Sequence, residues 1–294
     1  MENWDDIRIF LAVARQGGLA SAAHHLGLNH TTVARRLTGL ETSLHTRLVN
    51  RTPSGVTLTP AGQNFLEHAQ RIEIEALAAE QRVYSADGTV SGKVRLATRE
   101  GVGAWLICPK IAELRRRHPE LSLELVSEAR TISLLKRDAD ITISLQYPSQ
   151  GRVIVQKLTD YRLGLFASPS YLREYGQISS IEDLKERDVV WYVDDFVDIE
   201  EQRYMKRIVA NSRAGFRATN ILAQYAALVS GMGVGIIPLY QAAQDPNLIR
   251  LLPDQVEETR TYWLSAHPDT QDLPNVRAVI DFILEIVREK RSLF

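Results

Sequence analysis

Apolar residues in the first 44 positions recur at spacings of three and four, which is typical of amphipathic helices. Gly17-Gly18 and Gly27 divide this stretch into three helical segments, and Asn29 is placed to cap the third. Two short helices joined by a glycine turn, behind a supporting first helix, predict a helix-turn-helix. The apolar positions are Ile7, Phe10, Leu11 and Ala14, then Leu19, Ala22, Ala23 and Leu26, then Val33, Leu37, Leu40 and Leu44.

The third segment carries arginine and threonine opposite its apolar stripe, at about 100° per residue. Arginine can bind guanine through two hydrogen bonds, and threonine can meet base edges, thymine methyls or phosphates. The β-prone runs at residues 48–52 and 56–58 surround a Pro-Ser-Gly turn and predict a hairpin, or wing. Each helix alone is also typical of an ordinary core, so DNA binding is predicted from the succession of elements. The candidate DNA-binding residues are Asn29, His30, Thr31, Thr32, Arg35, Arg36, Thr38, Arg51 and Ser54.

A longer helix is predicted to follow, because Thr59-Pro60 is a favourable helix start. Its apolar positions repeat at alternating steps of four and three, the spacing of a coiled-coil seam. This pattern predicts a linker helix that pairs with a second copy, and packing against the chain's own next domain is the alternative. The positions are Phe65, Ala69, Ile72, Ala76, Ala79 and Val83.

A polar link at residues 87–92 marks a domain boundary, after which strand-like and helix-like runs alternate. This alternation predicts an α/β fold with a largely parallel sheet. The expected strands are residues 93–97, 121–126, 141–145, 162–167, 189–193 and 234–237, and the expected helices are residues 104–117, 132–137, 221–230 and 275–290.

Composition limits the number of domains, the cellular compartment and the mode of nucleic-acid binding that we expect. The 294 residues suggest two or three domains, and a hydrophobic share of 45% is ample for packed cores. A single cysteine, Cys108, and an acidic N-terminus in place of a signal peptide fit a reducing cytoplasm. The net charge of −1 excludes a protein that coats nucleic acid by bulk charge, yet residues 29–51 hold four arginines and one glutamate, a local +3.

Signals of catalysis or cofactor binding are weak. The glycines at residues 231–235 follow an expected helix and precede an expected strand, which is the wrong order for a dinucleotide site. Neither a phosphate-loop motif nor His-Glu-x-x-His occurs, and the adjacent His24 and His25 point to different helix faces. We therefore expect no enzyme activity, no cofactor and no metal.

The N-terminal residues resemble the signature of LysR-type transcriptional regulators, with Val49 and Ala34 where that family usually has Phe and Ser. The matching pieces there are Ala22-Ala23, Leu26, Val33-Ala34-Arg35, Leu40-Glu41, Leu44, Leu48-Val49-Asn50-Arg51 and Leu58-Thr59-Pro60-Ala61-Gly62. Family-like pieces continue in order along the chain at residues 118–125, 138–141, 165–172 and 230–238.

The resemblance implies a winged helix-turn-helix DNA-binding domain at residues 1–60, a dimerising linker helix at 61–90 and an effector-binding domain at 91–294. That domain would have two lobes of the periplasmic-binding-protein type. One lobe would take about residues 91–162 and 267–294, and the other about 163–266. The resemblance further implies a homo-oligomer in which dimers pair into tetramers, bound to double-stranded DNA.

Ligands of such domains bind in the crevice between the lobes, at the carboxyl ends of strands. Backbone N–H groups near residues 98–102 and the guanidinium of Arg99 or Arg130 favour an anion, and Tyr147 or Tyr192 could stack on an apolar body. Solvated ion pairs with neighbouring glutamates are the alternative for both arginines. The candidate effector-binding residues are Thr98, Arg99, Glu100, Gly101, Val102, Arg130, Leu145, Tyr147, Tyr192, Thr219 and Asn220.

We therefore expect a regulator whose DNA binding responds to a small molecule, such as a carboxylate. The rival classes are an enzyme or a solute-binding protein built on the two-lobed domain, and an architectural DNA-binding protein.

Overall fold

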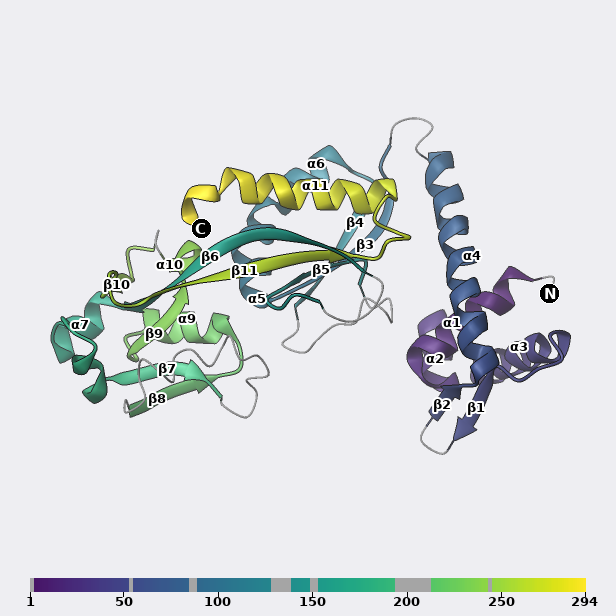
Figure 1. Cartoon of the computed structure of the whole chain (residues 1–294), viewed down its shortest axis with the longest axis horizontal. Coiled ribbons are helices and arrows are strands. Elements are labelled where there is room, and N and C mark those ends of the chain that lie inside the picture. The colour runs from purple at the N-terminus through teal and green to yellow at the C-terminus, as the bar shows by residue number, and fades with distance from the viewer. Residues whose placement is uncertain are drawn as a thin grey trace. The chain divides into compact units, whose positions relative to one another are not determined.

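The computed structural model describes residues 3–52, 55–84, 89–127, 139–148, 153–193, 213–242 and 245–294. The chain forms two compact units, residues 1–88 and 89–294, and each unit is described by itself (Figure 1). None of the helices within the described ranges is both long and apolar enough to span a lipid bilayer.

The first unit holds three short helices, a two-stranded hairpin and one long helix. Asn3 caps α1 by accepting a hydrogen bond from the amide of Asp5, and Gly17 and Gly27 end α1 and α2 at φ angles of 66° and 65°. Glycine suits both ends because this left-handed conformation is unfavourable for other residues. The elements are α1 (Trp4–Gln16), α2 (Leu19–Leu26), α3 (His30–Ser43), β1 (Val49–Thr52), β2 (Gly55–Leu58) and α4 (Pro60–Tyr84).

The beginning of α4 is part of the core of the first unit. Phe65 packs edge-on against Phe10 of α1 with ring centroids 5.1 Å apart, and Ala69 is fully buried in the same cluster. Arg15 of α1 also pairs with Glu73 of α4. The expectation that the whole apolar stripe of this helix forms a seam with a second copy is therefore wrong for Phe65 and Ala69.

The described residues of the second unit form a nine-stranded mixed sheet in the order β4-β3-β5-β11-β6-β9-β7-β8, with β10 paired to β6. Neighbouring strands at each end of this order are parallel, whereas β6 and β11 form a long antiparallel pair between the two parallel parts (Figure 1). The strands are β3 (Gly92–Thr98), β4 (Leu121–Ser127), β5 (Ile141–Ser144), β6 (Ile154–Ala167), β7 (Asp188–Tyr192), β8 (Arg213–Ala218), β9 (Val234–Pro238), β10 (Ile249–Leu251) and β11 (Glu257–Ala266).

The expected largely parallel sheet is thus corrected to a mixed one, because β11 and most of β6 were not predicted. Both strands carry exposed polar residues such as Lys157 and Glu257, which hide the apolar alternation. They run between two lobes, each with its own apolar core, and the expected lobe boundary at residues 162/163 falls inside β6.

The helices of the second unit pack against the sheet. The predicted helix at residues 104–117 consists of successive turns of different pitch, because Pro109 has no N–H to donate to the carbonyl of Trp105. Lys290 supplies the missing donor, with its Nζ 3.1 Å from that carbonyl oxygen. The expected helix at residues 132–137 lies outside the described part of the chain. The helices are α5 (Glu100–Val102), α6 (Ile111–Arg117), α7 (Pro169–Tyr175), α9 (Ile221–Val229), α10 (Leu239–Ala242) and α11 (Pro274–Glu289).

Candidate functional site

The N-terminus of α3 is organised by Asn29. Its Oδ1 accepts hydrogen bonds from the backbone N–H of Thr32 and from the hydroxyl of Thr31, both at 2.8 Å. Asn29, His30 and Thr31 are exposed at this end of the helix, which lies beside the hairpin β1–β2 (Figure 1). A helix N-terminus with exposed polar groups is suited to contact a phosphate.

Arg35 and Thr38 lie on the exposed face of α3, opposite buried Val33, Leu37 and Leu40. Arg51 of β1 donates a hydrogen bond to Thr38 Oγ1 at 3.3 Å, so the wing and α3 present one surface. Arginine and threonine on that surface are the residue types that contact bases and phosphates.

Two other candidate positions differ from this pattern. Arg36 points back to α1, where its Nη1 lies 3.3 Å from Asp5 and 3.4 Å from Asp6, so two carboxylates balance its charge. Ser54 lies outside the described residues.

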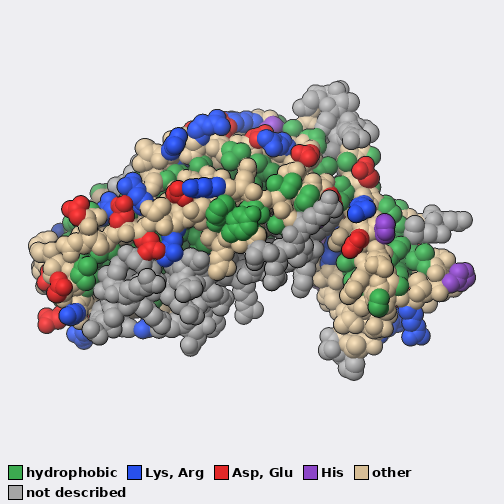
Figure 2. Space-filling view, in the orientation of Figure 1, with side chains coloured by type: hydrophobic (Ala, Val, Ile, Leu, Met, Phe, Trp, Pro, Cys, Tyr) green, Lys and Arg blue, Asp and Glu red, His purple; other side chains and the backbone are tan. Residues whose placement is uncertain are grey.

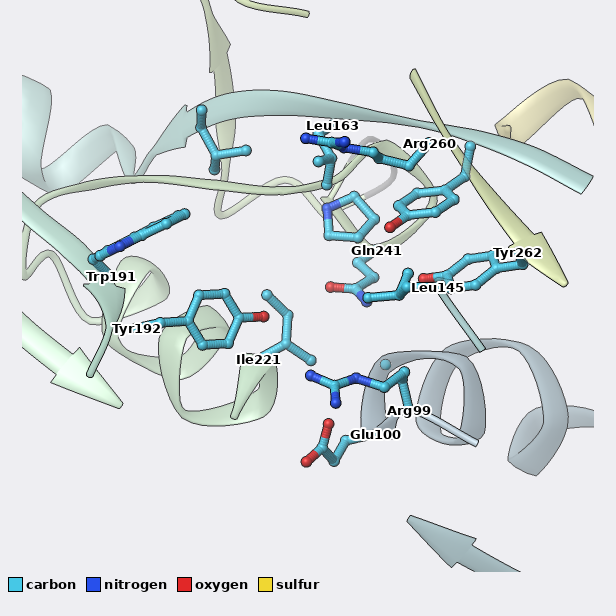
Figure 3. Close-up of a pocket in the computed structure, with 14 residues that line it drawn as sticks. Arg99, Glu100, Leu145, Leu163, Trp191, Tyr192, Ile221, Gln241, Arg260 and Tyr262 are labelled. Atoms are coloured by element: carbon cyan, nitrogen blue, oxygen red, sulfur yellow. The ribbon is translucent and has the colours of Figure 1, made fainter. Parts of the chain in front are cut away.

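A cleft in the second unit lies where the carboxyl ends of several strands meet, as expected for two-lobed binding domains. Residues from β3, β5, β7 and β9, or directly after them, line an empty volume of about 670 Å³ that includes its open mouth. Charged, aromatic and apolar side chains converge on this cleft, as they do in small-molecule sites. Figure 3 shows Tyr192 and Ile221 on one side of the cleft and Arg99 and Glu100 on another.

The structure brings five of the candidate effector-binding residues to this cleft, namely Arg99, Glu100, Gly101, Leu145 and Tyr192. The others have different positions. Thr98 and Val102 are buried next to the lining residues, and Arg130 lies outside the described residues.

Three further candidates do not line the cleft. Tyr147 is 60% exposed and contacts Trp263 edge-on. Thr219 is exposed, and Asn220 caps α9 by accepting a hydrogen bond from the amide of Ala223.

Several lining residues were not predicted from the sequence. Most of these lie within the long strands β6 and β11 or in α10, whereas the sequence-based prediction considered residues at the ends of expected strands. No sequence signal identifies Arg260 and Tyr262, because the polar residues of β11 hide its alternation and only the packing of the folded chain brings both to the cleft. The lining residues that were not predicted include Tyr161, Trp191, Ile221, Gln241, Arg260 and Tyr262.

Tyr161 and Tyr262 line the cleft and form a buried group with Tyr240. The ring of Tyr161 stacks on that of Tyr262 at 4.1 Å, and the hydroxyls of Tyr262 and Tyr240 are 3.0 Å apart. Burial raises the pKa of Tyr240 to about 12 and holds the pKa values of Tyr161 and Tyr262 above their usual range. All three are therefore neutral at physiological pH and act as hydrogen-bonding and stacking groups.

The charged lining residues are Arg99, Arg260 and Glu100, two positive and one negative, and Arg260 also pairs with Glu258 outside the lining. No group of three or more His, Cys, Asp or Glu in the described ranges is arranged to hold a metal ion. Acidic and basic side chains are interspersed on the visible face of the second unit (Figure 2). The lining therefore combines three charged side chains with aromatic and apolar ones.

A winged helix-turn-helix followed by a two-lobed domain with a cleft at its strand ends defines the class of ligand-responsive DNA-binding regulators. Comparison with known families agrees. Residues 4–63 match the bacterial regulatory helix-turn-helix proteins of the lysR family, and residues 87–288 match the LysR substrate binding domain. The chain belongs to the LysR family of transcriptional regulators, and it is a DNA-binding regulator rather than an enzyme.

Curated relatives extend over nearly the whole chain. It is 28% identical to an HTH-type transcriptional regulator of Xanthomonas campestris pv. campestris, over 95% of this chain and 84% of that protein. It is 25% identical to the HTH-type transcriptional activator TtdR of Escherichia coli K12, over 95% of this chain and 91% of that one.

Solved structures share the fold. CrgA, a LysR-type regulator from Neisseria meningitidis, is 24% identical with a TM-score of 0.60, over 97% of this chain and 99% of that chain. Full-length LysG from Corynebacterium glutamicum is 20% identical with a TM-score of 0.64, over 98% of both chains.

Proposed function

We propose that this regulator reads its operator with α3 and the wing, and that a small carboxylate in the cleft changes its DNA binding. Arg35 and Thr38 are assigned to base edges, and the Asn29–Thr32 end of α3 and Arg51 to phosphates. His30 and Arg36 are assigned to the border of the same surface, and Ser54, from the sequence of the wing, to a phosphate. The exposed polar face of α3, joined to the wing by the hydrogen bond from Arg51 to Thr38, supports this assignment.

The observation that carries the effector proposal is the lining of the cleft. Arg99 and Arg260, the latter also paired with Glu258, bring guanidinium groups to the cleft, and arginine binds carboxylates through paired hydrogen bonds. Trp191, Tyr192 and the buried tyrosines offer flat apolar surface for the rest of the molecule.

A ligand that contacts both lobes would favour their closed arrangement and shift the population toward it. In an oligomer, this shift would change the spacing of the two recognition helices and hence the affinity for paired half-sites.

We place the dimer contact on the exposed part of α4, formed by Ile72, Ala76 and Ala79, and propose that dimers pair into tetramers. Unpaired apolar side chains on a long helix are suited to pack against a second copy. As an operator-binding protein, the regulator is assigned to the cytoplasm.

Calorimetry with purified full-length protein tests the effector proposal. We expect carboxylates to bind the wild type and to bind Arg99→Gln at least tenfold more weakly, because the charge pairing is lost. Arg115→Gln, which removes the same charge from an exposed position of α6, should bind them like the wild type. Binding of cationic ligands or neutral sugars in place of carboxylates would contradict the proposal.

A further inference from the structure

Gln241 is a buried polar residue at the junction of the two lobes. It belongs to the short helix α10, whose Tyr240 packs in the core of the first lobe and whose Leu239 and Ala242 pack in the core of the second. The Gln241 side chain is only 5% exposed, yet it lines the cleft. Its position is therefore held by packing on both sides.

The nitrogen and the oxygen of the Gln241 amide differ in their hydrogen bonding. Its Nε2 donates a hydrogen bond to the hydroxyl of Tyr240 at 3.2 Å, and that hydroxyl is bonded in turn to Tyr262. Its Oε1 is buried and has no hydrogen-bond partner in the described part of the protein. Figure 3 shows this oxygen on the side of the amide that faces Ile221 and Tyr192.

In the structure the amide is oriented with Nε2 toward Tyr240, and the hydroxyl of Tyr240 can then donate to Tyr262. Reversal of the amide would direct both N–H donors of Gln241 away from Tyr240 and toward the cleft. Gly101 also lies directly against Nε2, so closely that a Cβ there would collide with it.

A buried acceptor without a partner is unfavourable, and proteins rarely retain one unless a ligand or an ordered water satisfies it. A ligand in the cleft that offers an N–H or O–H to Oε1 would supply the missing hydrogen bond. A ligand of equal size without such a donor would exclude water from Oε1 and leave the oxygen unpaired. Sites of this kind discriminate strongly against analogues that lack the donor.

We propose that Gln241 determines effector specificity, and that the effector is a carboxylic acid bearing a hydroxyl or amino donor that reaches Oε1. The proposal rests on the carboxylate-binding cleft proposed above and adds the requirement for the donor. Arg99 and Arg260 bind the carboxylate, and Gln241 of α10 accepts the hydrogen bond from the donor.

Calorimetry of the full-length protein with two matched sets of acids tests the proposal. The first set is 3-phenyllactate, phenylalanine and 3-phenylpropionate, and the second is malate, aspartate and succinate. Within a set, the molecules share a carbon skeleton and differ in the hydroxyl, amino group or hydrogen at one carbon. In at least one set, we expect a donor-bearing acid to bind about 10- to 100-fold more tightly than its unsubstituted parent.

The variant Gln241→Leu should remove this preference, so that the acids of a set bind with affinities within about twofold of one another. Gln241→Met offers a second, more flexible apolar replacement should the first fold poorly, and the wild-type comparison requires no variant. A structural role for Gln241 would weaken all three acids of a set alike.

Equal affinity for the parent and substituted acids would overturn the role of Gln241 and leave the carboxylate cleft standing. Persistence of the preference in Gln241→Leu would assign the donor to another residue and also overturn the proposal. Failure of every acid to bind while neutral ligands bind would overturn the cleft proposal as well, and failure of every ligand to bind would overturn the proposed effector class.

Discussion

Arg35 and Arg36 are adjacent in sequence but have different environments. Arg36 is within ion-pair distance of Asp5 and Asp6, whereas Arg35 lies on the exposed face of α3. An arginine near DNA contributes to direct recognition of bases only where its guanidinium group can reach a base edge. The two residues therefore allow base recognition to be separated from charge.

Replacement of Arg35 by Ala should weaken binding to the operator by about 1–3 kcal/mol, because it removes the arginine that is placed to bind a base. Arg36→Ala should instead lower the free energy of unfolding by about 1 kcal/mol or less, as expected for a largely exposed ion pair. Fluorescence anisotropy with an operator duplex and urea unfolding measure the two effects. Equal operator affinity of wild type and Arg35→Ala would refute the assigned role.

Some of this residue-level detail could be predicted from sequence. The exposed positions of α3 follow from spacing, because a regular helix converts intervals along the chain into angles. The partners of Arg36 could not be predicted, since they lie 30 and 31 residues away on another helix. Gln241 and Arg260 were missed for the same reason, because tertiary packing alone brings them to the cleft.

At the scale of elements, the start of α4 is fixed by close contact with the preceding segment. Thr59 Oγ1 donates to the carbonyl of Arg47 at 2.7 Å and accepts from the amide of Gly62 at 2.9 Å. A Cβ at Gly62 would lie 1.9 Å from the carbonyl oxygen of Leu48, so only glycine fits there. Gly39 of α3, by contrast, has no heavy atom within 4 Å of the position of an added Cβ.

Gly62→Ala should lower the free energy of unfolding of the first unit by about 1–3 kcal/mol, because backbone must move to accept the methyl group. The matched control Gly39→Ala should raise it by about 0.5–1 kcal/mol, since alanine favours a helix interior. Thermal and urea unfolding of both variants measure these changes. Similar effects of the two substitutions would contradict the close packing at α4.

The exposed part of α4 provides a second prediction at this scale. Ala76→Asp would place a charge on the proposed dimer contact and should weaken association at least tenfold, or about 1.4 kcal/mol. Asn64→Asp is the control, since it adds the same charge at an exposed position of α4 outside the proposed contact. Analytical ultracentrifugation measures both, and unchanged association of Ala76→Asp would exclude this contact.

Elements with a clear apolar period were predicted closely, such as α9 and α11, whose observed bounds differ from the expected ones by a single residue at one or both ends. The strand β11 and most of β6 were not predicted, because exposed polar residues interrupt their apolar alternation. The seam predicted for α4 was partly wrong, since a heptad pattern does not reveal whether its partner is a second copy or α1.

At the scale of the whole molecule, the second unit depends on tyrosines packed where β6 and β11 run between the lobes. Burial raises the pKa of Tyr240 from 10.0 to about 12, although its hydrogen bonds with Tyr262 and Gln241 act in the opposite direction. The unfolded chain ionises its tyrosines near pH 10, while the folded chain keeps Tyr240 neutral. The resulting stability is therefore fully present below pH 10 and is lost as the pH rises toward 12.

We expect the free energy of unfolding of the second unit to fall steeply between pH 10 and 12, with a contribution from Tyr240 of about 3 kcal/mol. Urea unfolding across this range measures the loss, and the absorbance of tyrosinate reports which tyrosines ionise. Tyr240→Phe should reduce the slope because it removes one of the groups that ionise only on unfolding. An equal slope in this variant would contradict the assignment.

The central claim is that α3 of this LysR-family regulator reads specific DNA through Arg35. Capture of genomic fragments on the purified protein, followed by sequencing, tests it most directly when wild type and Arg35→Ala are compared. The account predicts that the wild type enriches fragments with paired half-sites spaced by whole helical turns, and that Arg35→Ala loses this enrichment. Enrichment of the same fragments to the same degree by both proteins would contradict it.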